Sequence, residues 1–139
     1  MEKSNLFTLD VESRKGQELI LITDEVQILV KQSEVKNGMC FLFNPHSTAS
    51  LTINSYLDPN TGADLDSEID RIIPTRVNFH HILDTPTDAS AHVKTSVIGS
   101  NMLLIIKDGE LLLGKSQGIF FWEFDGPRDR NVIVKIIDC

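Results

Sequence analysis

The four histidines of this sequence all fall between positions 46 and 92, and imidazole is both a common metal ligand and a proton carrier near neutral pH. His80 and His81 are adjacent, so only one of them faces a given site if the segment is extended. His46 begins a segment that alternates polar and apolar residues, whereas His92 lies in the first turn of a predicted helix. Three separate elements can therefore each bring one imidazole to a common point.

Three neutral imidazoles and a water molecule form one known arrangement at catalytic zinc, and imidazole ligands suit other divalent metals too. The spacing of the histidines is long and contains no local motif such as HExxH, so ordinary hydrogen-bonded histidines are the alternative to a shared metal site. Asp88 lies one helical turn before His92. We interpret it as the N-cap of the helix, or as a hydrogen-bond partner that orients the His92 ring.

Positively charged side chains that suit an anionic ligand occur in two other segments. Arg128 and Arg130 lie in a turn, where they either bind phosphate or carboxylate or remain as solvated surface charges. Lys115 belongs to residues 109–116, which match the phosphate-loop pattern GxxxxGK[ST]. A phosphate loop must lead into a helix, whose N-terminal amides bind the phosphates. Here the variable positions of the match form an apolar strand and a further strand follows, so we interpret the segment as a hairpin and not as a nucleotide site.

The elements that must position these residues are short and can be predicted from periodicity, caps and turn residues. Helices are expected after Thr23 up to Asn37-Gly38, from Thr61 or Asp64 to Ile73, and over 89–98. Strands are expected over 19–22, 39–43, 46–54, 75–82 (a weaker candidate), 102–106, 111–113, 119–124 and 132–137, with a hairpin at Asp108-Gly109. Because strands and helices do not alternate regularly, the pattern predicts an α+β fold with mainly antiparallel β-sheets and about three helices.

Length and composition favour one domain over residues 1–139, with 41% apolar residues and a net charge of −7. The acidic balance argues against a nucleic-acid surface, and no apolar run approaches the roughly 20 residues of a membrane span. Residues 1–10 lack the pattern of a secretory signal. With only Cys40 and Cys139, a disulfide framework is not expected, and the sequence predicts a cytoplasmic protein.

A series of short motifs occurs in a fixed order from about Leu21 to Ile136. They are ITDEV at 22–26, NG at 37–38, PHSTASLTIN at 45–54, AHVKTS at 91–96, DGEL at 108–111, QGI at 117–119 and EFDGPR at 123–128. In this order the motifs resemble the YjbQ family, also called the secondary thiamine-phosphate synthase family. The sequence is therefore identified as that of a YjbQ-like protein.

The resemblance implies a small α+β protein that assembles as a homotrimer and has a histidine site for a metal. It also implies a weak ability to join a pyrimidine pyrophosphate to a thiazole phosphate, which yields thiamine phosphate and pyrophosphate. His46, His81 and His92 match the histidines of the family, and Arg128 and Arg130 match its arginines.

Three positions depart from the family pattern. Ser55 stands where the family usually has Glu, Asp88 where it often has Asn, and Ser116 where its GTWQG motif has Trp. The first and third changes remove an acid/base group and a stacking surface.

We expect a transferase in which the three matched histidines hold a divalent metal, zinc foremost, and act in catalysis. Arg128, Arg130, Lys115 and Thr48 are then expected to bind a small phosphorylated substrate. Two alternatives use the same residues. One is a non-catalytic metal- or anion-binding trimer, which Ser55 and Ser116 favour, and the other is a metal-assisted hydrolase of a phosphoester.

Overall fold

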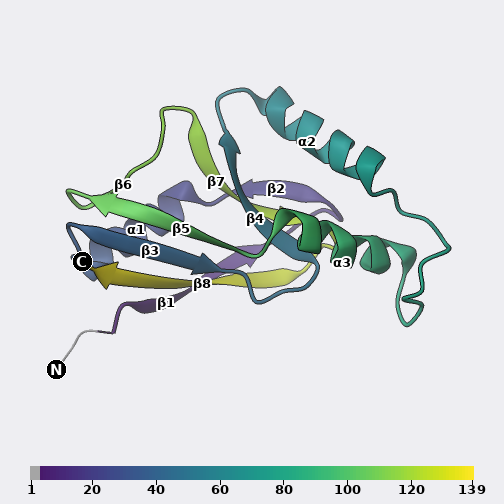
Figure 1. Cartoon of the computed structure of the whole chain (residues 1–139), viewed down its shortest axis with the longest axis horizontal. Coiled ribbons are helices and arrows are strands. Elements are labelled where there is room, and N and C mark those ends of the chain that lie inside the picture. Colours follow the sequence, from purple (N-terminus) through teal and green to yellow (C-terminus); the bar gives the residue numbers. More distant parts are fainter. Residues whose placement is uncertain (1–3) are drawn as a thin grey trace.

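The computed structural model describes residues 4–139 (Figure 1). Residues 1–3, which belong to the predicted 1–139 domain and to the N-terminal segment 1–10, lie outside this described part. The helices are α1 (Thr23–Ser33), α2 (Pro59–Ile72) and α3 (Pro86–Ile98). The strands are β1 (Leu6–Glu12), β2 (Glu18–Leu21), β3 (Gly38–Phe43), β4 (Ala49–Ser55), β5 (Asn101–Lys107), β6 (Glu110–Leu111), β7 (Gln117–Glu123) and β8 (Asp129–Asp138). No helix in this described range is both long and apolar enough to cross a membrane.

The strands form two antiparallel sheets, which confirms the predicted α+β class. One sheet has the order β1-β8-β3-β5-β6, and the other has the order β2-β7-β4. The predicted hairpin joins β5 to β6, with φ angles of 53° at Asp108 and 80° at Gly109. A tight two-residue hairpin turn requires two successive positive φ angles, which Asp and Gly adopt more readily than most residues. This is why the Asp-Gly pair predicted the hairpin.

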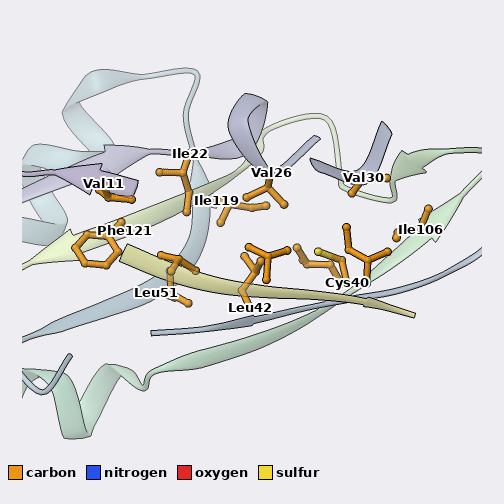
Figure 2. Packing of buried hydrophobic residues seen from close by; sticks show 14 of the residues in the cluster. Val11, Ile22, Val26, Val30, Cys40, Leu42, Leu51, Ile106, Ile119 and Phe121 are labelled. Atoms are coloured by element: carbon orange, nitrogen blue, oxygen red, sulfur yellow. The ribbon is translucent and has the colours of Figure 1, made fainter. Parts of the chain in front are cut away.

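The main core lies between the two sheets and α1 (Figure 2). Val26 and Val30 of α1 are fully buried, and they lie above Cys40 and Leu42 of β3. Phe121 of β7 closes the other end of this cluster. Burial also raises the pKa of the Cys40 thiol to about 12, so this side chain packs as an apolar group.

A second, smaller core lies where α2 and α3 cover the three-stranded sheet. It contains Ile69, Ala91, Trp122 and Phe124. Ser50 of β4 is fully buried and lies within hydrogen-bond distance (3.4 Å) of the Thr95 carbonyl oxygen of α3. The polar face of the alternating strand is therefore covered at this point by a helix. This packing directs the opposite side of α3 to solvent.

The helix ends differ from the predicted ones. The Thr23 hydroxyl accepts a hydrogen bond from the Ile119 amide (2.8 Å) and does not cap α1. This helix ends at Ser33, before the predicted Asn37-Gly38, because Glu34 adopts a left-handed φ of 63°. Asp58, and neither Thr61 nor Asp64, caps α2 by accepting from the Asn60 amide at 2.9 Å. The Asp58 cap lies three residues before Thr61 and six before Asp64, so periodicity placed the start of this helix too late.

One other predicted element is absent, and one strand was missed. Residues 75–82 form no strand, because their backbone is a series of bends between α2 and α3. β1 was not predicted at all. Its apolar residues Leu9 and Val11 alternate with exposed polar residues, a pattern typical of an edge strand that pairs on one side only.

Candidate metal centre

Three side chains with metal-ligating atoms meet at the N-terminal end of α3. The carboxylate oxygen Oδ2 of Asp88 lies 2.8 Å from Nε2 of His81 and 3.2 Å from Nε2 of His92. The two imidazole rings meet edge to face with their centroids 5.1 Å apart. One ligand atom from each of the three residues lies within 4.8 Å of the other two. The structure thus forms a compact His–Asp–His group.

Local sequence explains how α3 presents two of these residues. The hydroxyl of Thr85, the N-cap, accepts from the Asp88 amide at 3.1 Å, and Pro86 occupies the first turn. Asp88 is therefore not the cap, and its carboxylate is available to other groups. Because Asp88 and His92 are four residues apart, their side chains lie on the same face of the helix. His81 comes from the loop that precedes α3.

The electrostatics of the group favour a negative charge on Asp88. Its side chain is only 11% exposed, whereas His81 and His92 are 39% and 40% exposed. Burial alone would raise the pKa of Asp88, but the hydrogen bond with His81, the interaction with Asp125 and the charge of His92 outweigh it and hold this pKa below its ordinary value. Asp88 is therefore an anion at neutral pH.

The donor set fits a divalent metal. Two imidazole nitrogens and one carboxylate oxygen are the ligands of several catalytic zinc sites and of non-haem iron(II) sites. Ligand atoms around tetrahedral zinc lie about 3.3 Å apart, and the separations in this group, from 2.8 Å up to 4.8 Å, bracket that value. An open depression of 490 Å³, lined by the two histidines and by Phe79, His80, Ala89 and Val93, gives small molecules access.

His46 does not belong to this group. Its Nε2 accepts a hydrogen bond from the Asn131 amide at 3.0 Å, and its ring packs edge to face against Phe121. Burial and the nearby Arg130 charge lower the pKa of His46, so the ring is neutral, with its proton on Nδ1. The structure therefore brings together two of the three predicted imidazoles and adds Asp88, for which the spacing to His92 was the available signal.

Arg130 and Thr48 belong to a buried network next to His46. The Arg130 guanidinium donates to Glu123 Oε1 and to the Thr48 hydroxyl, both at 2.8 Å. The Ser13 hydroxyl donates to the same Glu123 oxygen at 2.7 Å. Glu123 is fully buried and Arg130 is 7% exposed. In this structure both predicted substrate-binding residues hydrogen-bond within the protein, and sequence reasoning did not find Glu123.

Arg128 and Lys115 lie in very different places. Arg128 is half exposed and pairs with Asp125, whose carboxyl group interacts with that of Asp88, so it lies near the His–Asp–His group. Lys115 lies in the β6–β7 loop, where it lines a separate depression of 310 Å³ with Leu21 and Tyr56. Figure 1 shows this loop and the start of α3 at opposite ends of the molecule. The phosphate-loop match is followed by β7 and not by a helix, as the sequence analysis predicted.

These features define an α+β protein with two antiparallel sheets and a His–Asp–His group at a helix N-terminus. A family model described as "UPF0047 protein YjbQ-like" matches residues 7–139, and the chain belongs to this family. A UPF0047 protein of Methanocaldococcus jannaschii is 42% identical over 95% of this chain and 94% of its own length. The YugU protein of Bacillus subtilis is 36% identical over 95% of this chain and 98% of its own.

Solved structures show the same fold. A YjbQ/UPF0047 protein of Clostridium acetobutylicum superposes with a TM-score of 0.88 at 39% identity, covering 94% of this chain and 99% of that one. A YbjQ-like protein of Sulfolobus solfataricus, described as being of unknown function, gives a TM-score of 0.92 at 30% identity over 99% of both chains.

Proposed function

We propose that this protein is a metal-dependent transferase that binds a divalent cation, zinc foremost, at His81, Asp88 and His92 and acts on small phosphorylated molecules. The observation that carries the proposal is the convergence of two half-exposed imidazoles on one buried, anionic carboxylate, with ligand atoms within 4.8 Å. A bound cation would supply positive charge that stabilises negative charge developing on a leaving group.

The reaction we propose is the synthesis of thiamine phosphate. The thiazole nitrogen forms a bond with the methylene carbon of the pyrimidine pyrophosphate, while the bond from that carbon to oxygen breaks and pyrophosphate leaves as an anion. Arg128 would bind that anion, because its Nε and Nη2 donate to Asp125 while Nη1 has no hydrogen-bond partner among the described residues. Arg130 and Thr48 would act indirectly, by stabilising the buried network around Glu123, because their side chains already hydrogen-bond to each other.

This proposal is tested by measuring bound metal and thiamine phosphate formation in the same preparations. We expect zinc at one ion per chain and product above background for the wild-type protein. We expect both to be lost in His92→Ala, because one of three ligands is removed. The matched control is His80→Ala, which removes a neighbouring imidazole outside the group and should leave the bound metal unchanged. Full activity in metal-free protein would contradict the proposal.

A second candidate is a metal-binding protein without transferase activity. Ser55 and Ser116 favour it, since the family usually places Glu and Trp at these positions. Zinc bound at one ion per chain with no thiamine phosphate would support this candidate. Release of phosphate from a generic phosphoester by the same protein would instead identify the hydrolase alternative, which uses the same three ligands.

We further propose that the protein acts in the reducing environment of the cytoplasm. Its two cysteines, buried Cys40 and exposed Cys139, are free thiols. Free thiols are characteristic of proteins in reducing compartments.

We also propose that copies of the chain associate, as the homotrimer that the family resemblance implies. The support is the outer face of the larger sheet, where Phe41 lies opposite Leu103 and Met39 lies between Ile105 and Ile137. Leu103 is 60% exposed and Ile105 56% exposed. A contiguous apolar face of this kind is unusual on a monomer, and symmetric association is a common way to cover it.

Replacing Leu103 by lysine is expected to convert the assembly to monomers, because the new charge would be desolvated at the centre of this face. Sedimentation velocity would show the change as a fall to the mass of the 15.6 kDa chain. Leu112→Lys is the matched control, since Leu112 is similarly exposed at 57% but lies in the β6–β7 loop. A monomeric wild-type protein, or an unchanged assembly in Leu103→Lys, would reject this interface.

A further inference from the structure

Of the three proposed metal ligands, only His81 lies outside a helix. Asp88 and His92 are fixed relative to each other by the backbone of α3, because they lie one turn apart on the same face. His81 belongs to the loop formed by residues 74–84, between the caps of α2 and α3. Figure 1 shows this loop at the edge of the molecule, away from both sheets. Formation of the His–Asp–His group therefore depends on what holds the loop against α3.

The apolar side chains of the loop contribute little to its position. Val77, Ile82 and Leu83 are each at least 79% exposed, so they gain almost no burial from the rest of the protein. The guanidinium of Arg76 lies 4.6 Å from the centre of the Phe79 ring, but this cation–π contact joins two residues of the loop itself. Polar contacts must therefore supply most of the attachment of the loop to α3.

Among the described residues, two hydrogen bonds join the loop to α3. One is the bond of His81 with Asp88, and the other joins the hydroxyls of Thr75 and Ser90 at 3.1 Å. The Ser90 hydroxyl already donates its proton to the Thr87 carbonyl oxygen at 3.0 Å, so Thr75 is the donor to Ser90. Ser90 is 1% exposed, so water has little access to compete for its oxygen. The Thr75–Ser90 bond is thus the attachment of the loop that does not itself involve a proposed ligand.

We infer that Thr75 is a positioning residue, which ties the start of the loop to α3 so that His81 meets Asp88 and His92. Ser90 lies between Asp88 and His92 in α3, so this tether fixes the loop to the part of the helix that carries both other ligands. Thr75 precedes His81 by only six positions, so it limits how far the imidazole can move away. The inference deepens the proposed function and rests on it for its consequence in metal binding.

Zinc affinity, measured by competition with a chromophoric chelator, tests the consequence for metal binding. Thr75→Val removes the hydroxyl and keeps the shape of the side chain. We expect it to bind zinc about 3–10-fold more weakly, which is the usual effect of one hydrogen bond between neutral groups on an equilibrium constant. Thr75→Ser keeps the hydroxyl, so its affinity should stay close to the wild-type value. Thr87→Val is the matched control, because it removes an exposed hydroxyl of α3 that has no hydrogen-bond partner among the described residues.

A double-mutant cycle tests whether Thr75 acts through Ser90. Ser90→Ala removes the acceptor of the bond, and Thr75→Val removes its donor. The double variant should bind zinc no more weakly than the weaker of the two single variants, because both changes remove the same bond. Fully additive losses would show that the two residues act independently, and would contradict the inference.

A second readout needs no metal. In the metal-free protein, Thr75→Val should shift the ¹⁵N imidazole resonances of His81, because the bond with Asp88 forms less often once the loop is untethered. Thr75→Ser and Thr87→Val should leave these resonances near their wild-type positions, and thermal unfolding establishes that each variant is folded. Wild-type protein that binds no zinc would reject the proposed function, while the His81 resonances would still decide the role of Thr75. Unchanged His81 resonances in folded Thr75→Val, or a Thr75→Ser variant that behaves like Thr75→Val, would overturn the inference.

Discussion

Replacement of Arg130 by methionine is expected to lower the free energy of unfolding by about 3–5 kcal/mol, because it leaves the buried Glu123 carboxylate without its charged partner. Glu123 is fully buried, and Arg130 supplies two of its hydrogen bonds, so no water can replace the lost guanidinium without opening the core. Chemical denaturation of the wild-type and variant proteins, analysed with a common slope, measures the difference.

The matched control is the double variant Glu123→Gln/Arg130→Met, in which the buried charge is absent but an acceptor for Ser13 remains. We expect it to be clearly more stable than Arg130→Met, because the main cost of the single change is an unpaired charge and not a lost bond. Equal stability of the single and double variants would show that the ion pair is not the origin of the effect.

The same pair affects stability at low pH. Burial alone would raise the pKa of Glu123, but the bonds from Arg130, Ser13 and the Asp125 amide outweigh it and lower this pKa below its value in the unfolded chain. A group with a lowered pKa in the folded state stabilises the fold above its unfolded pKa, about 4.3 for Glu, and this contribution is lost as the pH falls. Acid should therefore destabilise the wild-type protein more than the double variant.

Replacement of Asp88 by alanine is expected to reduce zinc affinity by more than about a hundredfold. Loss of a residue that only hydrogen-bonds to a metal ligand already lowers metal affinity about 10–100-fold, and loss of the ligand itself should cost more. Asp88 supplies the only anionic oxygen of the His–Asp–His group, and its pKa is lowered, so the oxygen is charged at neutral pH. Isothermal titration of metal-free protein with zinc measures the change.

Two further variants sharpen this result. Asp88→Asn keeps a neutral oxygen at the position where the family often has Asn, so its affinity should lie between those of the wild type and Asp88→Ala. Asp84→Ala is the matched control, since Asp84 is an exposed carboxylate in the same segment but outside the group. If Asp88→Ala binds zinc as tightly as Asp84→Ala, then this carboxylate is not a ligand.

Local patterns predicted much of the backbone. The apolar run at 39–43 is β3, and Asp108-Gly109 closes the predicted hairpin because both residues adopt the positive φ angles that the turn needs. The helix around His92 ends before Gly99 as expected, although Thr85 and not Asp88 is its cap. Errors concentrate at helix starts, where several neighbouring Ser, Thr and Asp side chains can each supply the cap.

The contacts of the site were less accessible from sequence. The spacing of Asp88 and His92 placed both on one helical face, and the choice of His81 over His80 came from the resemblance. By contrast, the bond between the Asn131 amide and His46 joins residues 85 positions apart. The bond between the Ser13 hydroxyl and Glu123 spans 110 positions. Such contacts follow from strand register across two sheets, which no local pattern specifies.

The amino-acid sequence by itself determined the class of fold, most of its strands and helices, and the residue types capable of metal chemistry, because periodicity, caps and turns depend on neighbours in the chain. Only the tertiary structure decided which of those residues meet. It paired His81 and His92 with Asp88, turned His46 and Arg130 into partners of Asn131 and Glu123, and separated Lys115 from the group. The physical reason is that these contacts form between distant segments, where packing and buried charge select the partners.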